Sequence, residues 1–157
     1  MHRIALPIAL LALVACGGED ALQHDGQGHD GHAAVDHAAH APRMGGTLIE
    51  LGEHELQLEL VYDAQAGRLT VYVWDGHVEH PVRTAAASAP VVLDLDGAEV
   101  ALALAARADV LTGETVGDSA RFEVDDPRLK GLSAVSGRIG PIAIAGRSWG
   151  PVEFRAR

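Results

Sequence analysis

Histidine is concentrated in one short segment of the chain. Five of the nine histidines lie between residues 24 and 40, among aspartate, glycine and alanine. Neutral imidazole is the commonest protein ligand for zinc, copper and nickel, and two histidines a few residues apart can chelate one ion. The candidate ligands in this segment are His24, His29, His32, His37 and His40.

Two pairs within the segment have a chelating spacing. Glycines surround His29 and His32, and glycine lets the backbone wrap around an ion at little steric cost. His37 and His40 lie in an alanine-rich stretch, where one helical turn would place both rings on the same face. The adjacent aspartates could ligate the ion directly or hold an imidazole in the required tautomer. Without a folded cage, copper should be preferred over nickel and zinc.

A second group of candidate ligands lies in an expected loop from Trp74 to Pro81. His77 and His80 again have the spacing of a chelating pair, and Glu79 lies between them. Histidines in a loop are also common on solvated surfaces, so the sequence leaves both interpretations open. His54, between two glutamates, is expected to be a surface residue.

Composition restricts the function classes. The 157 residues include 12 Lys and Arg against 22 Asp and Glu, a formal net charge of −10, whereas nucleic-acid binding requires a basic face. We therefore expect no nucleic-acid partner. Hydrophobic residues make up 48% of the chain but aromatic residues only 4%, so the core should consist of Leu, Val and Ile.

Enzymatic activity is not expected. Gly117-Asp118-Ser119 is similar to the nucleophile block of one esterase family, but no histidine follows His80 to act as the base. His54-Glu55 lacks the second histidine of a zinc-protease helix, and the sequence contains neither a P-loop nor a dinucleotide-binding fingerprint.

The first fifteen residues are expected to form a signal peptide. The apolar run from Ile4 to Ala15 is shorter than the roughly 20 residues that span a bilayer as a helix. Leu13-Val14-Ala15-Cys16 resembles the bacterial lipobox, in which the cysteine is acylated and becomes the first residue of the mature chain. The resemblance implies that Cys16 carries acyl chains such as palmitate, which anchor the protein in the cell envelope. The residue after this cysteine is Gly17 and not aspartate, and in proteobacterial lipoproteins that pattern favours the outer membrane.

These patterns divide the chain into three segments. We expect a signal peptide over residues 1–15, a lipidated cysteine with a disordered, histidine-rich tether over 16–43, and a folded domain over 44–157. The tether lacks apolar periodicity, as spacers in exported lipoproteins often do. Metal binding and a simple spacer are therefore alternative functions for it.

From residue 47 onward, alternating apolar residues predict β-strands. We expect strands over residues 56–62, 69–73, 91–95, 100–104, 120–124, 142–144 and 152–154. Asp96-Gly97 favours a type I′ hairpin turn, and Asp126-Pro127 should begin a short helix that ends near Leu132. Seven or eight short strands predict an antiparallel, immunoglobulin-like β-sandwich, with a small β-barrel as the alternative.

The stretch from Met44 to Leu56, followed by Leu69 to Val73, resembles small exported β-sandwich modules of bacteria. Some of these modules precede the adaptor subunits of heavy-metal efflux pumps of the resistance-nodulation-division type, and others are free-standing lipoproteins. The resemblance implies a metal-efflux or other envelope protein as partner. Our hypothesis is an envelope lipoprotein that binds copper or zinc, as a buffer or a metal-handling accessory. The alternative is a non-enzymatic adhesion or assembly module with an incidental histidine-rich spacer.

Overall fold

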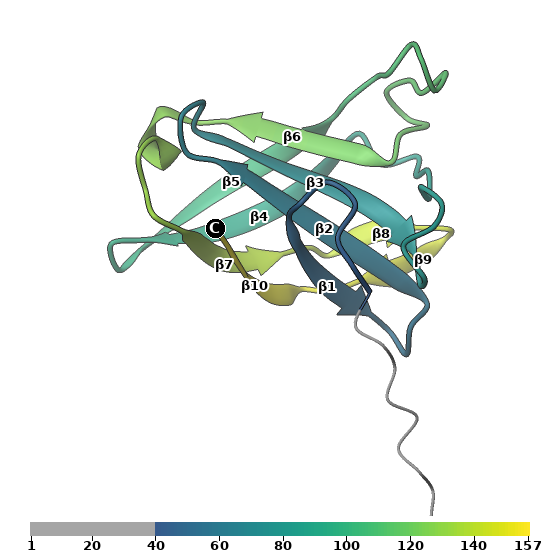
Figure 1. Ribbon diagram of the computed structural model, residues 1–157, viewed down its shortest axis with the longest axis horizontal. Helices are drawn as coiled ribbons and strands as arrows, with labels where there is room; N and C mark the ends of the chain where they lie inside the picture. The colour runs from purple at the N-terminus through teal and green to yellow at the C-terminus, as the bar shows by residue number, and fades with distance from the viewer. Residues whose placement is uncertain (1–39) are drawn as a thin grey trace, which may run out of the picture. The chain divides into compact units, whose positions relative to one another are not determined.

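The computed structural model describes residues 40–157, which form an antiparallel β-structure (Figure 1). Eight strands join one sheet in the order β1-β2-β3-β6-β5-β4-β7-β10, and β8 pairs with β9 in a second, two-stranded sheet. The elements of this part of the chain are β1 (Thr47–Leu51), β2 (Leu56–Asp63), β3 (Arg68–Asp75), β4 (Ser88–Leu95), β5 (Ala98–Ala106), β6 (Arg121–Asp125), the 3-10 helix η1 (Pro127–Leu129), β7 (Val135–Ile139), β8 (Ile142–Ile144), β9 (Arg147–Trp149) and β10 (Val152–Ala156).

The large sheet curls until its two edge strands, β1 and β10, lie side by side (Figure 1). Ladder hydrogen bonds join β1 only to β2 and β10 only to β7 among the described residues, so one seam of the barrel is not hydrogen-bonded. The all-β prediction is therefore confirmed. The single curled sheet matches the barrel alternative rather than two separate sheets packed face to face.

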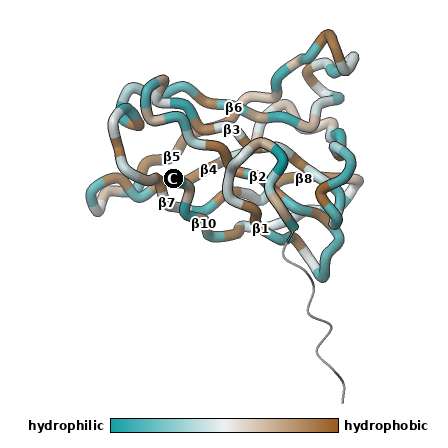
Figure 2. Tube along the Cα trace, in the orientation of Figure 1, coloured by the Kyte–Doolittle hydropathy of each residue, from teal (hydrophilic) through white to brown (hydrophobic). Residues whose placement is uncertain are grey.

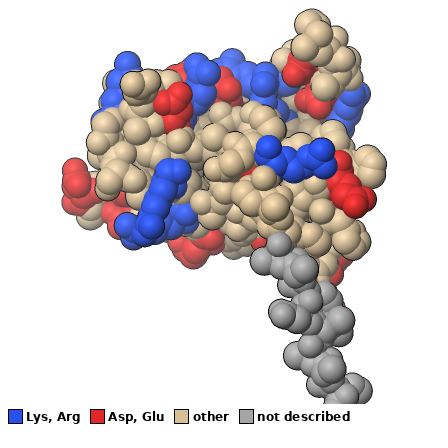
Figure 3. All heavy atoms as spheres, viewed as in Figure 1, with Lys and Arg blue, Asp and Glu red and all other residues tan. Residues whose placement is uncertain are grey.

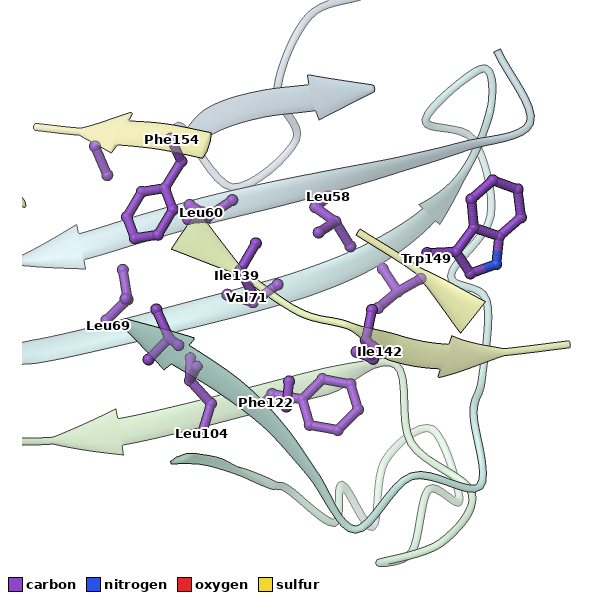
Figure 4. Packing of buried hydrophobic residues seen from close by; sticks show 14 of the residues in the cluster. Leu58, Leu60, Leu69, Val71, Leu104, Phe122, Ile139, Ile142, Trp149 and Phe154 are labelled. Carbon is purple, nitrogen blue, oxygen red and sulfur yellow. The ribbon is translucent and has the colours of Figure 1, made fainter. Parts of the chain in front are cut away.

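Leucine, valine and isoleucine dominate the interior of the barrel, as the composition predicts. Figure 4 shows side chains from β2, β3, β5, β6, β7 and β10 directed into one common core. Phe122 on β6 is the largest of the fully buried side chains. The fully buried aliphatic side chains around it include Leu58, Leu60, Leu69, Val71, Val73, Leu93, Leu104 and Ile139.

Two short elements cover opposite ends of the barrel (Figure 1). At one end, the β8–β9 hairpin buries Ile142, Ile144 and Trp149 against the core. At the other end, η1 buries Leu129, and the hydroxyl of Tyr62 lies at the carbonyl oxygens of Leu129 and Leu132. Both ends of the interior are thereby shielded from water.

The strands expected from alternation are all present, whereas β1, β7 and β9 were not predicted. The inward-facing positions of β7 include Gly137, which interrupts the apolar pattern. An added Cβ at Gly137 would lie 2.1 Å from the carbonyl oxygen of Val92, so the close approach of β7 to β4 requires glycine. The type I′ turn is confirmed, since Asp96 and Gly97 both have positive φ, 54° and 82°.

The charged surface carries both signs. Figure 3 shows basic and acidic side chains beside one another around the rim of one face. Exposed pairs include Arg68 with Asp125, at 2.7 Å, and Arg83 with Asp118, at 3.0 Å, and such pairs contribute little to stability. Within residues 40–157, no helix is long and apolar enough to cross a membrane.

Asp126 caps η1, as the sequence predicts, although the helix ends three residues earlier than expected. Its side chain accepts a hydrogen bond from the backbone N–H of Arg128 at 2.9 Å, and Lys130 already has an extended backbone. The side-chain hydrogen bond from the Arg128 guanidinium, followed by that from the Arg128 backbone, lowers the pKa of Asp126 to about 2. The folded state therefore favours the ionised carboxyl.

We expect Asp126→Ala to lower the free energy of unfolding by about 1 kcal/mol at neutral pH. Because the folded-state pKa is depressed, this contribution is present above about pH 4 and is lost as pH falls toward about 2. Urea unfolding of both proteins at several pH values should show the difference shrinking in acid. Asp126→Asn, which retains an acceptor that does not titrate, should be more stable than the Ala variant at low pH. A difference that stays constant down to the lowest pH would contradict this assignment.

Candidate metal centre

The β2–β3 hairpin places two histidines at the same end of the barrel. Its register pairs Leu56, the first residue of β2, with Asp75, the last residue of β3. His54 therefore lies just before one strand and His77 just after its neighbour. This juxtaposition follows directly from antiparallel pairing.

Gly76 brings the two turns that carry these histidines into direct contact. A Cβ added at Gly76 would lie 1.7 Å from the carbonyl oxygen of His54, so no larger residue fits without a backbone shift. His54 itself has a φ of 60°, in the left-handed region that few non-glycine residues adopt. The spacing between the two turns is thus set by backbone packing.

A buried carboxylate on β2 holds the segment that precedes β1. Glu59 is fully buried, and its Oε1 accepts hydrogen bonds from the backbone N–H groups of Met44, at 2.7 Å, and Gly46, at 3.0 Å. Its Oε2 accepts from the backbone N–H of Arg43, at 3.1 Å, and from the indole N–H of Trp74, at 3.0 Å. Four donors surround this carboxylate, which compensates for the loss of water on burial. We call residues 43–46 the strap.

Arg43 ties the start of the strap to the loop after β3. Its guanidinium lies 5.7 Å from the centroid of the Trp74 ring, within the range of a cation–π interaction. The same group donates hydrogen bonds to the carbonyl oxygens of Val78, at 3.2 Å, and Glu79, at 3.3 Å. Arg43, which the sequence assigns to the tether, therefore contacts the barrel.

The ring of His40 lies beside two imidazole rings of the barrel, at the end that carries His54 and His77. The centroid of the His40 ring lies 5.7 Å from that of His77 and 6.3 Å from that of His54, with interplanar angles of 78° and 80°. His40 is the last histidine of the histidine-rich segment, whereas the other two belong to the barrel. The structure thus brings one end of that segment to two histidines of the domain.

Glu50 lies beside the ring of His54 and accepts a hydrogen bond from its backbone. One carboxylate oxygen lies 3.2 Å from His54 Nδ1, and the other accepts a hydrogen bond from the His54 backbone N–H at 3.0 Å. Glu50 therefore holds the turn through the backbone N–H of His54, with its carboxylate close to the ring. A carboxylate close to the imidazole is common among metal-ligating histidines.

The His40 ring stands slightly farther from each of its two neighbours than it would in a metal complex. Within residues 40–157, no group of three or more His, Cys, Asp or Glu side chains is arranged to hold an ion. Zinc–nitrogen bonds of about 2.0–2.1 Å at tetrahedral angles would place ring centroids about 5.2 Å apart. The observed separations of 5.7 and 6.3 Å exceed that value by roughly 0.5 and 1.1 Å. Side-chain torsions alone can produce shifts of this size.

The two histidines of the second predicted pair, His77 and His80, have different partners in the structure. The ring of His80 has its Nδ1 3.0 Å from the carboxylate of Asp75, and its side chain is 78% exposed. Desolvation raises the pKa of Asp75, but hydrogen bonds from the Glu79 backbone and from His80 outweigh it, so the pKa lies below its usual value. The charged Asp75 carboxylate thus binds the backbone of the loop and the His80 ring. The ring of His77 instead lies beside that of His40.

The remaining predicted site residues lie outside the described part of the chain. They are Cys16, His24, His29, His32 and His37.

Sequence reasoning missed three residues of this centre. His54 was expected to be an ordinary surface residue, and Glu50 was not considered. Glu59 was placed on the outer face of its strand with Gln57, yet both side chains are buried. The hairpin register contained the signal for His54, because it places the residues before β2 beside those after β3.

Comparisons of this chain with protein-family models, with curated proteins and with solved structures found no match.

Proposed function

We propose that this protein is an envelope lipoprotein, anchored through Cys16, that binds copper or zinc through its histidine-rich segment. It serves as a metal buffer or as an accessory to a metal-efflux or other envelope partner, and Gly17 after the cysteine favours the outer membrane. The observation that carries this proposal is the meeting of His40, from that segment, with His54 and His77 of the barrel.

Two further observations support binding rather than catalysis. The net charge of −10 attracts cations to the protein as a whole. Ser119, the potential nucleophile of the esterase-like block, is fully buried, and its hydroxyl donates to the carbonyl oxygen of Arg107 at 2.6 Å. That hydroxyl therefore has a structural partner and no access to substrate.

The proposal is tested by titrating the chain from Gly17 to Arg157 with Cu²⁺ and, separately, with Zn²⁺ in a calorimeter. We expect binding with a dissociation constant in the micromolar range or below. Deleting residues 17–39 should remove most of the bound metal and leave the thermal midpoint nearly unchanged, because the buried core lies within residues 40–157. Failure of the longer chain to bind either ion would refute the proposal, as would full metal stoichiometry in the shorter chain.

A second candidate function, an adhesion or assembly module, is favoured by one surface feature. Val110 and Leu111, in the loop between β5 and β6, are 92% and 93% exposed, and Val116 in the same loop is 63% exposed. Figure 2 shows this hydrophobic segment at the tip of the projecting loop before β6. Exposed apolar residues grouped in this way are typical of contact sites for other proteins. A chain that binds no metal in the titration would leave this function as the better supported one.

A further inference from the structure

We infer that His40, His54 and His77 form one discrete site for a divalent transition-metal ion, with a coordination position left open for exchange. The inference rests on the proposed function and deepens it. It assigns one ion to the barrel itself rather than to the histidine-rich segment alone. The class of ligand is a borderline ion such as Zn²⁺ or Cu²⁺, since neutral imidazoles suit these metals.

The positions of the three ligands are fixed by the backbone before any ion arrives. Packing of Gly76 on the carbonyl of His54 sets the distance between the turns of His54 and His77. The hydrogen bonds of the strap to Glu59, together with those of Arg43 to the loop, set the approach of His40. Only side-chain torsions then have to change on binding, so little conformational entropy is lost.

A carboxylate also lies beside one ligand. Glu50 has one oxygen 3.2 Å from Nδ1 of His54 and accepts a hydrogen bond from the His54 backbone N–H, which holds the turn that carries this ring. The three rings come from three different segments, so an ion bound among them would crosslink the strap region to both turns.

Three histidines leave the fourth position of a tetrahedral ion available. Structural zinc sites fill all four positions with protein ligands, whereas sites that exchange a ligand keep one open. A donor from another molecule can occupy that position. The site is therefore suited to exchanging its ion with a second ligand.

The test uses the chain from Gly17 to Arg157 in which all four histidines before His40 are replaced by glutamine, so that the barrel site is isolated. We expect this four-histidine variant to retain one bound Zn²⁺ per chain. Adding His54→Asn or His77→Asn should weaken that binding at least tenfold. His80→Asn, in the same loop but paired with Asp75, is the matched control and should leave the affinity unchanged within twofold. Asparagine is chosen at position 54 because it tolerates positive φ.

Co²⁺ gives a second, spectroscopic readout on the same proteins. Tetrahedral imidazole coordination should produce intense visible absorption in the four-histidine variant, and His77→Asn should abolish it. Thermal midpoints without metal establish that each variant is folded. If His54→Asn does not fold, the His77 comparison still decides the question.

The possible failures are distinguishable. If the unsubstituted chain binds Zn²⁺ but the four-histidine variant does not, the barrel site is wrong and the proposed function stands. The inference is also wrong if His80→Asn weakens binding as much as His77→Asn does. If neither the unsubstituted chain nor the variant binds Zn²⁺ or Cu²⁺, the inference and the proposed function fail together.

Discussion

Replacing Glu59 with glutamine is expected to lower the free energy of unfolding by about 3 kcal/mol. The amide nitrogen of glutamine would face two backbone N–H groups that now donate to a carboxylate oxygen. Two buried hydrogen bonds are then lost, and N–H groups face one another without an acceptor between them. The change preserves shape and volume, and the loss therefore reports on hydrogen bonding rather than packing. Chemical denaturation monitored by Trp fluorescence measures it, since Trp74 shares the same carboxylate.

The Glu59 variant should also lose metal affinity in the four-histidine background, because the strap no longer fixes the approach of His40. Glu153→Gln is the control, since Glu153 is exposed on β10 and the same chemical change there should alter stability by less than about 0.5 kcal/mol. Equal stability of the two variants would mean that the Glu59 hydrogen bonds contribute little to folding.

Gly76→Ala should be destabilising by about 2–3 kcal/mol and should separate the two turns of the metal centre. The new methyl group would lie 1.7 Å from the His54 carbonyl oxygen and 2.7 Å from its carbon, so one turn must move by more than an ångström. That displacement moves His54 away from His77, and Zn²⁺ affinity should fall at least tenfold. Thermal unfolding and Zn²⁺ titration measure the two effects separately.

Gly113→Ala separates steric overlap from the general effect of replacing a glycine. Gly113 has a φ of +71° but no atom within 4 Å of an added Cβ, so only the left-handed backbone is penalised, at about 1 kcal/mol. Its metal affinity should be that of the parent chain. If Gly113→Ala and Gly76→Ala weaken Zn²⁺ binding alike, the contact at Gly76 does not set the geometry of the centre.

Local sequence patterns predicted the strands well because alternation directly reports which side chains face a core. Leu58 and Leu60 are buried as that rule requires, and Asp96-Gly97 forms the expected turn. The same rule failed for Glu59, because alternation assigns only two faces to a strand and assumes that the polar one meets water. The strap and Trp74 cover that second face, and the contact joins residues thirteen or more positions apart.

The candidate metal centre was only partly accessible to sequence reasoning. His40 and His77 were predicted as ligands separately, each with a nearby sequence partner. Their actual neighbours come from other segments, since chelating spacing along a chain says nothing about which loops meet at one end of a barrel. The β2–β3 register would have linked His54 to His77, but no local pattern places His40 there without the hydrogen bonds to Glu59.

If the chain is anchored through Cys16 as proposed, the strap has a mechanical consequence. Tension on the chain ahead of His40 would act first on residues 43–46 and on the hydrogen bonds that they donate to Glu59. Only after these bonds break would the load reach β1, an edge strand bonded to the sheet on one side alone. The hydrogen bonds to the buried carboxylate would then resist the pull before it reached the seam between β1 and β10.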